Sequence, residues 1–189
     1  MWHSPSSRLL RSVPSAVGRR GWHSSAVRAI ATGSPLPNLP LQEGSPANEV
    51  GALEFFKPYS KAILIGIPGA FTPGCSRTHV PGYLEWRDTL RAKGVEAIGC
   101  VAVNDAFVMA AWGKSLDDQG HIHFFADPQA QFVKALDLSF DASGVLGGIR
   151  AKRFALVLEH GIVKDVQVEP DNTGLSCSLA PSVAKHVGA

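Results

Sequence analysis

Apolar and polar positions along the chain form an alternating series of strand-like and helix-like segments. The strand-like segments are short, continuous apolar runs, which is the pattern of strands covered on both faces. The helix-like segments repeat apolar positions at helical spacing, as Tyr83, Trp86 and Leu90 do. Strands that alternate with helices predict a mostly parallel sheet with helices on its faces. The runs occupy residues 61–67, 95–103 and 121–126, and the helical segments occupy residues 75–93, 106–116 and 128–138.

The last part of the chain predicts a β-hairpin followed by a helix. Apolar runs at residues 154–159 and 162–169 are separated only by His160 and Gly161, which we interpret as a hairpin turn. A closing helix is expected at residues 179–187. The resulting order is βαβαβα, then a hairpin, then a helix. This order predicts an α/β protein of the thioredoxin-like fold, with a central mixed β-sheet flanked by helices.

A single domain is expected over residues 32–189, because a chain of 189 residues suits one compact unit. The Pro- and Gly-rich stretch 33–46 predicts an extended connector that lies over this domain. The longest apolar runs are far shorter than the ~20 residues that a membrane-spanning helix needs. The sequence therefore predicts no membrane span.

Residues 1–31 have the composition of an organelle-targeting leader. They are rich in Arg and Ser, contain no Asp or Glu, and carry interspersed apolar residues. A secretory signal fits less well, because no apolar stretch of about 7–15 residues follows the early charges. We expect a mitochondrial transit peptide, disordered and cleaved on import into the matrix. A plastid transit peptide and a disordered basic tail are the alternatives, and the C-terminal residues His-Val-Gly-Ala are not a peroxisomal tripeptide.

The net charge of the chain changes sign after the leader. Lys and Arg number 18 and Asp and Glu 16 in the whole sequence. Five of the arginines precede Ala29, which leaves 13 basic and 16 acidic residues in the remainder. A mildly acidic body lacks the basic surface that binds nucleic acid, so no nucleic-acid partner is expected.

Cys75 lies in a Pro- and Gly-rich loop directly after the first apolar run. The loop reads PGAFTPGCS from Pro68, and Thr72 followed by Pro73 is a favourable N-cap and first helical residue. Cys75 then falls in the first turn of the next helix. Unpaired backbone N–H groups and the helix dipole favour an anion there, so the thiolate is stabilised. The alternative is a buried structural thiol, which would not need such a loop.

Thiolate formation alone is too small an effect to make a fast catalyst. A thiol with a pKa of about 8.5 is roughly 3% ionised at pH 7, so full ionisation gains at most about 30-fold. A lower basicity also reduces nucleophilicity. Further rate enhancement requires groups that stabilise charge in the transition state.

The loop resembles the peroxiredoxin signature, in which a P-x-x-x-T-x-x-C loop and a distant arginine hold the peroxide. Pro68, Thr72 and Cys75 match the loop, and Arg153 in Lys-Arg-Phe matches the arginine. The resemblance implies that Arg153 pairs with the thiolate and with the peroxide oxygens, a role that suits its planar fork of donors. It also implies that Pro68 and Gly74 line the substrate pocket.

The resemblance extends over nearly all of residues 33–189 and is specific to the peroxiredoxin-5 class of atypical two-cysteine enzymes. The stretches VNDAF at 103–107 and GLSCSLAP at 174–181 carry it. In that class the resolving cysteine lies near the C-terminus of the same chain, and Cys177 matches it. The resemblance therefore implies that Cys75 is the peroxidatic cysteine and Cys177 the resolving cysteine.

The implied activity is that of a thiol-specific peroxidase, which reduces hydrogen peroxide and organic hydroperoxides. The peroxidatic cysteine would become a sulfenic acid and then part of an intramolecular disulfide. Thioredoxin is the reductant that the resemblance implies. No cofactor or metal is expected, and the protein would be a monomer or a homodimer.

Two other side chains have simpler interpretations. Cys100 lies inside an apolar run, where a buried thiol behaves as a small hydrophobe. His79 follows Cys75 by four residues and shares its helix face, which would also suit a Cys/His hydrolase or a metal pair. A metal site needs further converging ligands and a hydrolase needs an oxyanion hole, and the sequence shows neither. We expect His79 to pack or to form a hydrogen bond.

Two other classes of protein remain open. A disulfide oxidoreductase of the thioredoxin kind would carry a C-x-x-C motif, but Cys75 is followed by Ser-Arg-Thr. A non-catalytic redox-sensing or binding module of the same fold would not need Thr72 and Arg153 near the thiol. A peroxide-consumption assay with thioredoxin and its reductase separates these classes from a peroxidase.

Overall fold

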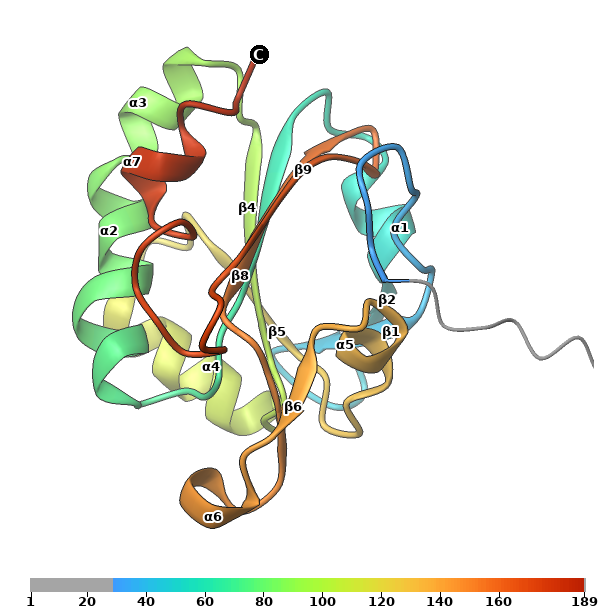
Figure 1. Ribbon diagram of the computed structural model, residues 1–189, viewed down its shortest axis with the longest axis vertical. Helices are drawn as coiled ribbons and strands as arrows, with labels where there is room; N and C mark the ends of the chain where they lie inside the picture. Colours follow the sequence, from blue (N-terminus) through green and yellow to red (C-terminus); the bar gives the residue numbers. More distant parts are fainter. Residues whose placement is uncertain (1–28, 189) are drawn as a thin grey trace, which may run out of the picture.

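A seven-stranded mixed sheet forms the centre of the protein, with the strand order β2-β1-β5-β4-β3-β8-β9 (Figure 1). The structure is a computed structural model that describes residues 29–188, so nearly all of the expected leader, residues 1–31, lies outside the described residues. The strands are β1 (Pro40–Glu43), β2 (Glu49–Gly51), β3 (Ala62–Gly66), β4 (Ala97–Ala102), β5 (His123–Ala126), β8 (Phe154–Glu159) and β9 (Ile162–Val168). Strands β6 (Ser139–Asp141) and β7 (Ile149–Ala151) form a separate antiparallel pair.

The three apolar runs of the sequence form the parallel centre of this sheet. Strand β3 pairs in parallel with β4, and β4 pairs in parallel with β5. All five residues of β3 and all six of β4 are buried. The predicted hairpin β8–β9 adds antiparallel strands to β3, and its turn residues His160 and Gly161 both have positive φ. The thioredoxin-like fold with a mixed sheet is thus confirmed.

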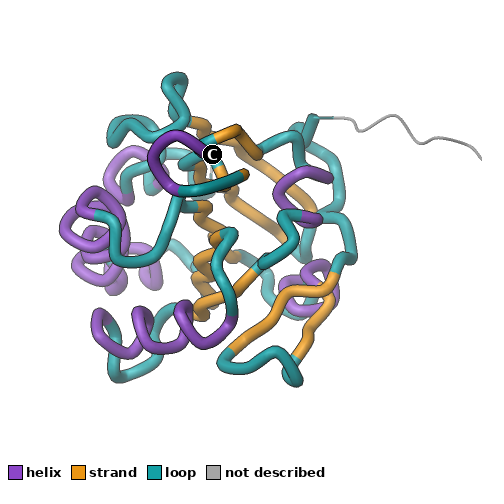
Figure 2. Tube along the Cα trace, turned by 90° about the horizontal axis from the view of Figure 1, so that it is seen from below, coloured by secondary structure: helices purple, strands orange, loops and turns teal. Residues whose placement is uncertain are grey.

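Helices cover both faces of the sheet. On one face lie the π-helical turn η1 and helices α2, α3, α4 and α7, and on the other lie α1 and α5 (Figure 1). In the view of Figure 2 the strands of the central sheet lie between helices on either side. Each face has its own apolar core. The bounds are α1 (Ala52–Phe56), η1 (Cys75–His79), α2 (Val80–Glu85), α3 (Arg87–Ala92), α4 (Ala106–Leu116), α5 (Gln131–Ala135), α6 (Ser143–Leu146) and α7 (Ala180–Val183).

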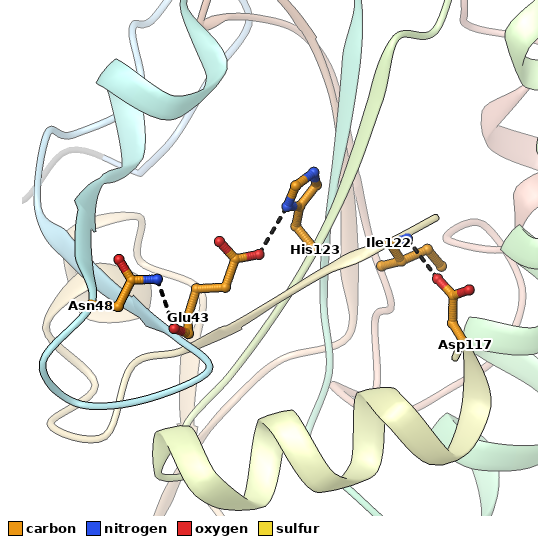
Figure 3. Close-up of polar contacts among 5 residues, drawn as sticks. All are labelled: Glu43, Asn48, Asp117, Ile122 and His123. Atoms are coloured by element: carbon orange, nitrogen blue, oxygen red, sulfur yellow. Dashed lines mark hydrogen bonds and ion pairs between the residues drawn. The ribbon is translucent and has the colours of Figure 1, made fainter. Parts of the chain in front are cut away.

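The N-terminal connector is more ordered than the sequence predicts. Part of it forms β1, which pairs antiparallel with β5 and with β2. The Glu43 carboxylate lies 2.8 Å from Nδ1 of His123, and the Asn48 amide donates to the Glu43 carbonyl (Figure 3). Nearby, the Asp117 carboxylate accepts from the backbone N–H of Ile122 at 2.7 Å and fixes the start of β5. The connector is therefore a strand of the sheet and not only a cover over it.

The helical segment predicted at 75–93 is broken into three pieces. It begins with helical residues at Pro73, passes through η1, and changes direction between α2 and α3 at Trp86, whose ψ is 1°. The helices predicted at 128–138 and 179–187 are shorter, as α5 and α7. Apolar spacing identified the buried face correctly but does not encode where a helix changes pitch.

Candidate active site

The loop between β3 and η1 forms one wall of the site. Pro68 and Gly69 are buried where β3 ends. The side chain of Asn104, which lies in the VNDAF stretch, accepts a hydrogen bond from the N–H of Ala70 at 3.0 Å. Thr72 donates from its hydroxyl to the Gly69 carbonyl at 2.9 Å. The loop is therefore held by side chains from two separate parts of the sequence.

Thr72 occupies the predicted position just before the helix but does not cap it with its side chain. Its carbonyl accepts from the N–H of Ser76, whereas its hydroxyl proton is directed back to Gly69. The capping interpretation is therefore wrong for the side chain. One consequence is that the Thr72 hydroxyl oxygen keeps lone pairs for another donor.

Cys75 begins the π-helical turn and is fully buried. The wide turn closes with a hydrogen bond from the N–H of Val80 to the Cys75 carbonyl. The predicted first-turn position of Cys75 is observed, but in a π-helix and not in a regular α-helix. Such turns are rare and occur frequently at functional sites.

Arg153 reaches the Cys75 sulfur from the start of β8. Its Nη1 donates to Sγ at 3.2 Å, and its Nε donates to the carbonyl of Thr173 at 3.1 Å. Its backbone is also fixed, because its N–H donates to Asn172 and its carbonyl accepts from Glu169. Arg153 is only 3% exposed, so its charge acts on the sulfur with little screening by water.

Two glycines make room for this arginine and its strand. A Cβ on Gly66 would overlap the ring of Phe154, the residue after Arg153. A Cβ on Gly74 would lie 3.2 Å from Nη2 of Arg153 and 3.5 Å from Leu175. The absence of a side chain at Gly74 therefore permits the guanidinium to lie against the cysteine turn.

Cys177 lies in the loop between β9 and α7 and is partly exposed. Its neighbours Ser176 and Ser178 surround the buried carboxylate of Glu169 with four hydrogen bonds of 2.6–3.0 Å. Burial alone would raise the pKa of Glu169, but these hydrogen bonds outweigh it and lower the pKa to about 2. Burial, then the charge of Glu169, raises the pKa of Cys177. Cys75 and Cys177 both carry free thiols.

His79 connects the cysteine turn to this loop. The Ser178 carbonyl accepts from the hydroxyl of Tyr83 at 2.7 Å and from Nε2 of His79 at 3.1 Å. Burial, then the charge of Arg153, lowers the pKa of His79 to about 3, so the ring is neutral at physiological pH. Nε2 then carries the proton. The predicted packing and hydrogen-bonding role of His79 is confirmed.

Cys100 lies in the middle of β4 and is fully buried in the same apolar core as Cys75. Burial, then the nearby Cys75, raises the pKa of the Cys100 thiol well above its usual range. This agrees with the predicted role of a small hydrophobe. Over residues 29–188, no three His, Cys, Asp or Glu side chains gather as a metal site would require, and no helix is long and apolar enough to cross a bilayer.

Comparison with known proteins places this arrangement in a family. The redoxin family model matches residues 31–185. A peroxisomal membrane associated protein 20 of Schizosaccharomyces pombe is 46% identical over 156 residues, which are 82% of this chain and 97% of the relative. The chloroplastic peroxiredoxin-2E-2 of Oryza sativa is 40% identical and is matched over 68% of its length by 77% of this chain.

Solved structures give the same result. Reduced Prx3 of Vibrio vulnificus in complex with hydrogen peroxide superimposes with a TM-score of 0.76 at 40% identity, over 84% of this chain and 99% of that one. Peroxiredoxin 5 of Alvinella pompejana superimposes with a TM-score of 0.74 at 34% identity, over 84% of this chain and 97% of that one. The chain therefore belongs to the redoxin family, as a thiol peroxidase. More particularly, it is a peroxiredoxin of the Prx5 type.

The structure brings together most of the residues that the sequence singled out, and it adds others. Thr72, Gly74, Cys75 and Arg153 form one continuous site, and Cys177 lies in the loop whose Thr173 carbonyl binds Arg153. Sequence analysis missed Glu169, Ser178 and Tyr83. A charged residue at the end of an apolar strand was the available signal for Glu169, but its partners are side chains and amides of a loop that only the fold places around it.

Proposed function

We propose that this protein reduces hydrogen peroxide and organic hydroperoxides through Cys75, and that a Cys75–Cys177 disulfide is then reduced by thioredoxin. The 3.2 Å hydrogen bond from Arg153 to the Cys75 sulfur carries this proposal, because it joins a thiol to a fixed cation inside the protein. The relative of known structure that was crystallised with hydrogen peroxide supports the substrate. Both cysteines belong to one chain, so the cycle needs no second subunit, and the protein acts as a monomer or homodimer.

In the first step the Cys75 thiolate attacks one peroxide oxygen. The S–O bond forms as the O–O bond breaks, the sulfur is oxidised to a sulfenic acid, and the leaving oxygen departs as water or an alcohol after taking a proton. Negative charge moves from sulfur to the leaving oxygen during this step. The guanidinium of Arg153 is placed to stabilise that charge, because it is buried, permanently charged and already oriented.

Thr72 acts as an acceptor in this proposal. Its own proton is directed to the Gly69 carbonyl, so its oxygen is free to accept the O–H of an incoming peroxide. This orients the proton-bearing oxygen toward the sulfur, so that it becomes the sulfenic oxygen and the other peroxide oxygen leaves. Pro68 and Gly74 form the adjacent wall of the substrate pocket, where the missing side chain of Gly74 leaves room beside Arg153.

In the second step the sulfur of Cys177 attacks the sulfenic sulfur of Cys75. The S–S bond forms, the S–O bond breaks, and the hydroxide takes the thiol proton and leaves as water. Two thiols of thioredoxin then reduce the disulfide by exchange. Cys100 takes no part, because it is enclosed within the core.

Three cysteine variants test the proposal. Cys75→Ser is expected to abolish peroxide reduction, and Cys177→Ser to allow one turnover without recycling by thioredoxin. Cys100→Ser, the matched control, should retain both steps. Stopped-flow peroxide decay in the presence and absence of thioredoxin and its reductase measures them. Fast decay with Cys75→Ser would contradict the proposal, and a non-catalytic module would show no peroxide consumption in any variant.

We also propose that residues 1–31 are a transit peptide that directs the protein to the mitochondrial matrix and is then cleaved, and that the folded domain occupies residues 32–189. The acid-free, Arg-bearing composition of the leader supports this. Among the described residues, the N–H of Ile30 donates to the Leu136 carbonyl, so the chain already contacts the domain just before the proposed boundary. N-terminal sequencing of the cellular protein tests the proposal. An intact Met1 contradicts it, and so does residence in peroxisomes, where the name of the S. pombe relative places that protein.

A further inference from the structure

The loop that carries Cys177 is folded around a buried negative charge. Oε1 of Glu169 accepts from the N–H groups of Ser176 and Ser178 and from the Ser178 hydroxyl, and Oε2 accepts from the Ser176 hydroxyl. Glu169 is 2% exposed. Cys177 therefore lies between two residues that are both bound to the same carboxylate. Hydrogen bonds to an ionised group are stronger than neutral ones, so this loop is firmly held.

A second anchor ties the loop to the turn that carries Cys75. The Ser178 carbonyl accepts from His79 and Tyr83, and His79 ends the π-helical turn that Cys75 begins. Figure 1 shows the loop between β9 and α7 passing beside α2. The His79 Nδ1 atom is buried without a hydrogen-bond partner among the described residues. Its ring is thus held in place by the Ser178 contact and by edge-to-face packing on Tyr83.

A third anchor is Arg153 itself. The same guanidinium donates to the Cys75 sulfur and to the carbonyl of Thr173, in the loop that leads to Cys177. Asp171 folds that part of the loop by accepting from the N–H groups of Thr173 and Gly174. Oxidation of the Cys75 sulfur can therefore affect the Cys177 loop through the contacts of both Arg153 and His79.

We propose that Glu169 is a positioning residue, which with His79 holds the Cys177 loop closed in the reduced protein and sets the rate at which the Cys75–Cys177 disulfide forms. The inference rests on the proposed function. Oxidation of Cys75 adds an oxygen beside Arg153, and unwinding of the π-helical turn then moves His79 away from Ser178. The loop loses this anchor and opens at the rate that the Glu169 hydrogen bonds permit.

The closed loop also protects Cys177 from unwanted reaction. While the loop is held, the charge of Glu169 adds to burial in keeping Cys177 in its protonated, less nucleophilic form. Once the loop opens, the thiol attacks the sulfenic sulfur, and water leaves with the sulfenic oxygen. A loop that opens slowly leaves the sulfenic acid exposed to a second peroxide, which oxidises it to a sulfinic acid and is itself reduced to water or an alcohol.

Glu169→Gln tests the proposal, because it removes the charge and part of the acceptor capacity while keeping the shape. Acid quench-flow followed by thiol alkylation and mass spectrometry measures sulfenic acid, disulfide and sulfinic acid separately. We expect peroxide attack at the unsubstituted rate and disulfide formation faster by about 10- to 100-fold, the effect of losing one hydrogen bond to a charged group. The sulfinic fraction under a large excess of peroxide should fall, and the pH at which Cys177 is half alkylated should decrease.

Glu159→Gln is the matched control, because Glu159 ends the neighbouring strand β8 and pairs with Lys164 while partly exposed. Glu159→Gln should change neither the rate of peroxide attack nor the rate of disulfide formation. Ser176→Ala is a milder second variant, which removes one hydrogen bond at an exposed position and keeps the ionised carboxylate. It tests whether the Glu169 hydrogen bonds hold the Cys177 loop, even if Glu169→Gln does not fold. Disulfide formation that is unchanged or slower in both variants overturns the inference while leaving the proposed function intact. Absence of a Cys75–Cys177 disulfide in the unsubstituted protein overturns both.

Discussion

Arg153 donates a hydrogen bond from Nη1 to the sulfur of Cys75, and both side chains are buried. The guanidinium is itself held by the Thr173 carbonyl, so it does not have to reorganise as charge develops. An oriented cation that is already desolvated stabilises a transition state more than the same cation in water does. This relationship leads to two predictions about the peroxide step.

Arg153→Gln should slow peroxide attack by more than the ~30-fold that thiolate population alone provides. The reason is that Arg153 acts on the transition state and not only on the Cys75 sulfur before the reaction. The measurement is the stopped-flow rate constant for peroxide attack from pH 6 to strongly alkaline pH. Arg87→Gln, which changes a partly exposed arginine paired with Asp88, is the control. Full recovery of the Arg153→Gln rate at high pH would limit Arg153 to tuning the ionisation of the thiol.

Gly74→Ala should also slow peroxide attack, although it removes no functional group. The new Cβ would lie 3.2 Å from Nη2 of Arg153, so the guanidinium must move by a few tenths of an ångström from its position beside the sulfur. Small misplacements of catalytic groups cost up to about 100-fold in rate. The control is Gly82→Ala in α2, where an added Cβ meets nothing within 4 Å and should stabilise the helix by about 0.5–1 kcal/mol. Equal rates for the two variants would show that the clearance at Gly74 has no catalytic role.

His79 should make the protein less stable as the pH falls below neutrality. Its pKa is about 3 in the folded protein, whereas an unfolded histidine has a pKa of ~6.5, so the unfolded chain binds an extra proton between these values. The free energy of unfolding should therefore fall by up to about 1.4 kcal/mol per pH unit in this range. Chemical denaturation of His79→Gln should show a flatter dependence, with His160→Gln at an exposed position as the control.

The useful window for this measurement is about pH 5–6.5, because an unfolded glutamate titrates only near ~4.3. The carboxylate of Glu169, with its lowered pKa of about 2, contributes stability that is present above that unfolded value and is lost as the pH falls toward 2. The two contributions thus separate by pH. Identical slopes for His79→Gln and the unsubstituted protein would contradict a neutral, buried His79.

Disulfide formation should unwind the π-helical turn. Cys75 is buried beneath Arg153 in the reduced protein, and Cys177 is held in a separate loop, yet a disulfide requires their Cα atoms within ~7 Å. We expect the amides just after Cys75 to exchange hydrogen faster in the disulfide form than in the reduced form. Hydrogen exchange with mass spectrometry measures this, and the buried strand β4 provides an internal control. Equal protection in both forms would mean that no unwinding is required.

The sequence predicted the parts of the fold that rest on local patterning. Strands β3 and β4 are continuous apolar runs, α4 begins and ends at the predicted residues, and the His160–Gly161 turn separates two apolar strands. Strands β1 and β2 were missed because they are short and mix polar with apolar residues, and β2 is an edge strand of the sheet. Their pairing depends on partners such as His123, which is 80 residues away from Glu43.

In the site too, the features that depend on local sequence were predicted, and those that depend on the folded structure were not. The cysteine loop is local, and a known motif identifies Arg153, so both were predicted. The π-helical geometry at Cys75 was not, since no residue type specifies it, and neither was the carboxylate of Glu169 inside the serine loop. The side chain of Thr72 was misinterpreted as a cap because the competing acceptor, the Gly69 carbonyl, becomes available only when the loop folds back on itself.

The N-terminal connector has a consequence for how the protein folds. Pro35 forms a bridge with Ile162 on β9, at one edge of the sheet, while β1 pairs with β5 toward the other. The connector is synthesised before almost every partner that fixes it, so its contacts are the most non-local in the chain, and such contacts form slowly. The domain can close only after the β8–β9 hairpin has been made and, if the leader directs import, only after that hairpin has crossed the membrane. Within the described residues, the connector is thus the first segment to be synthesised, and its pairing with β9 must wait until nearly the whole domain has been made.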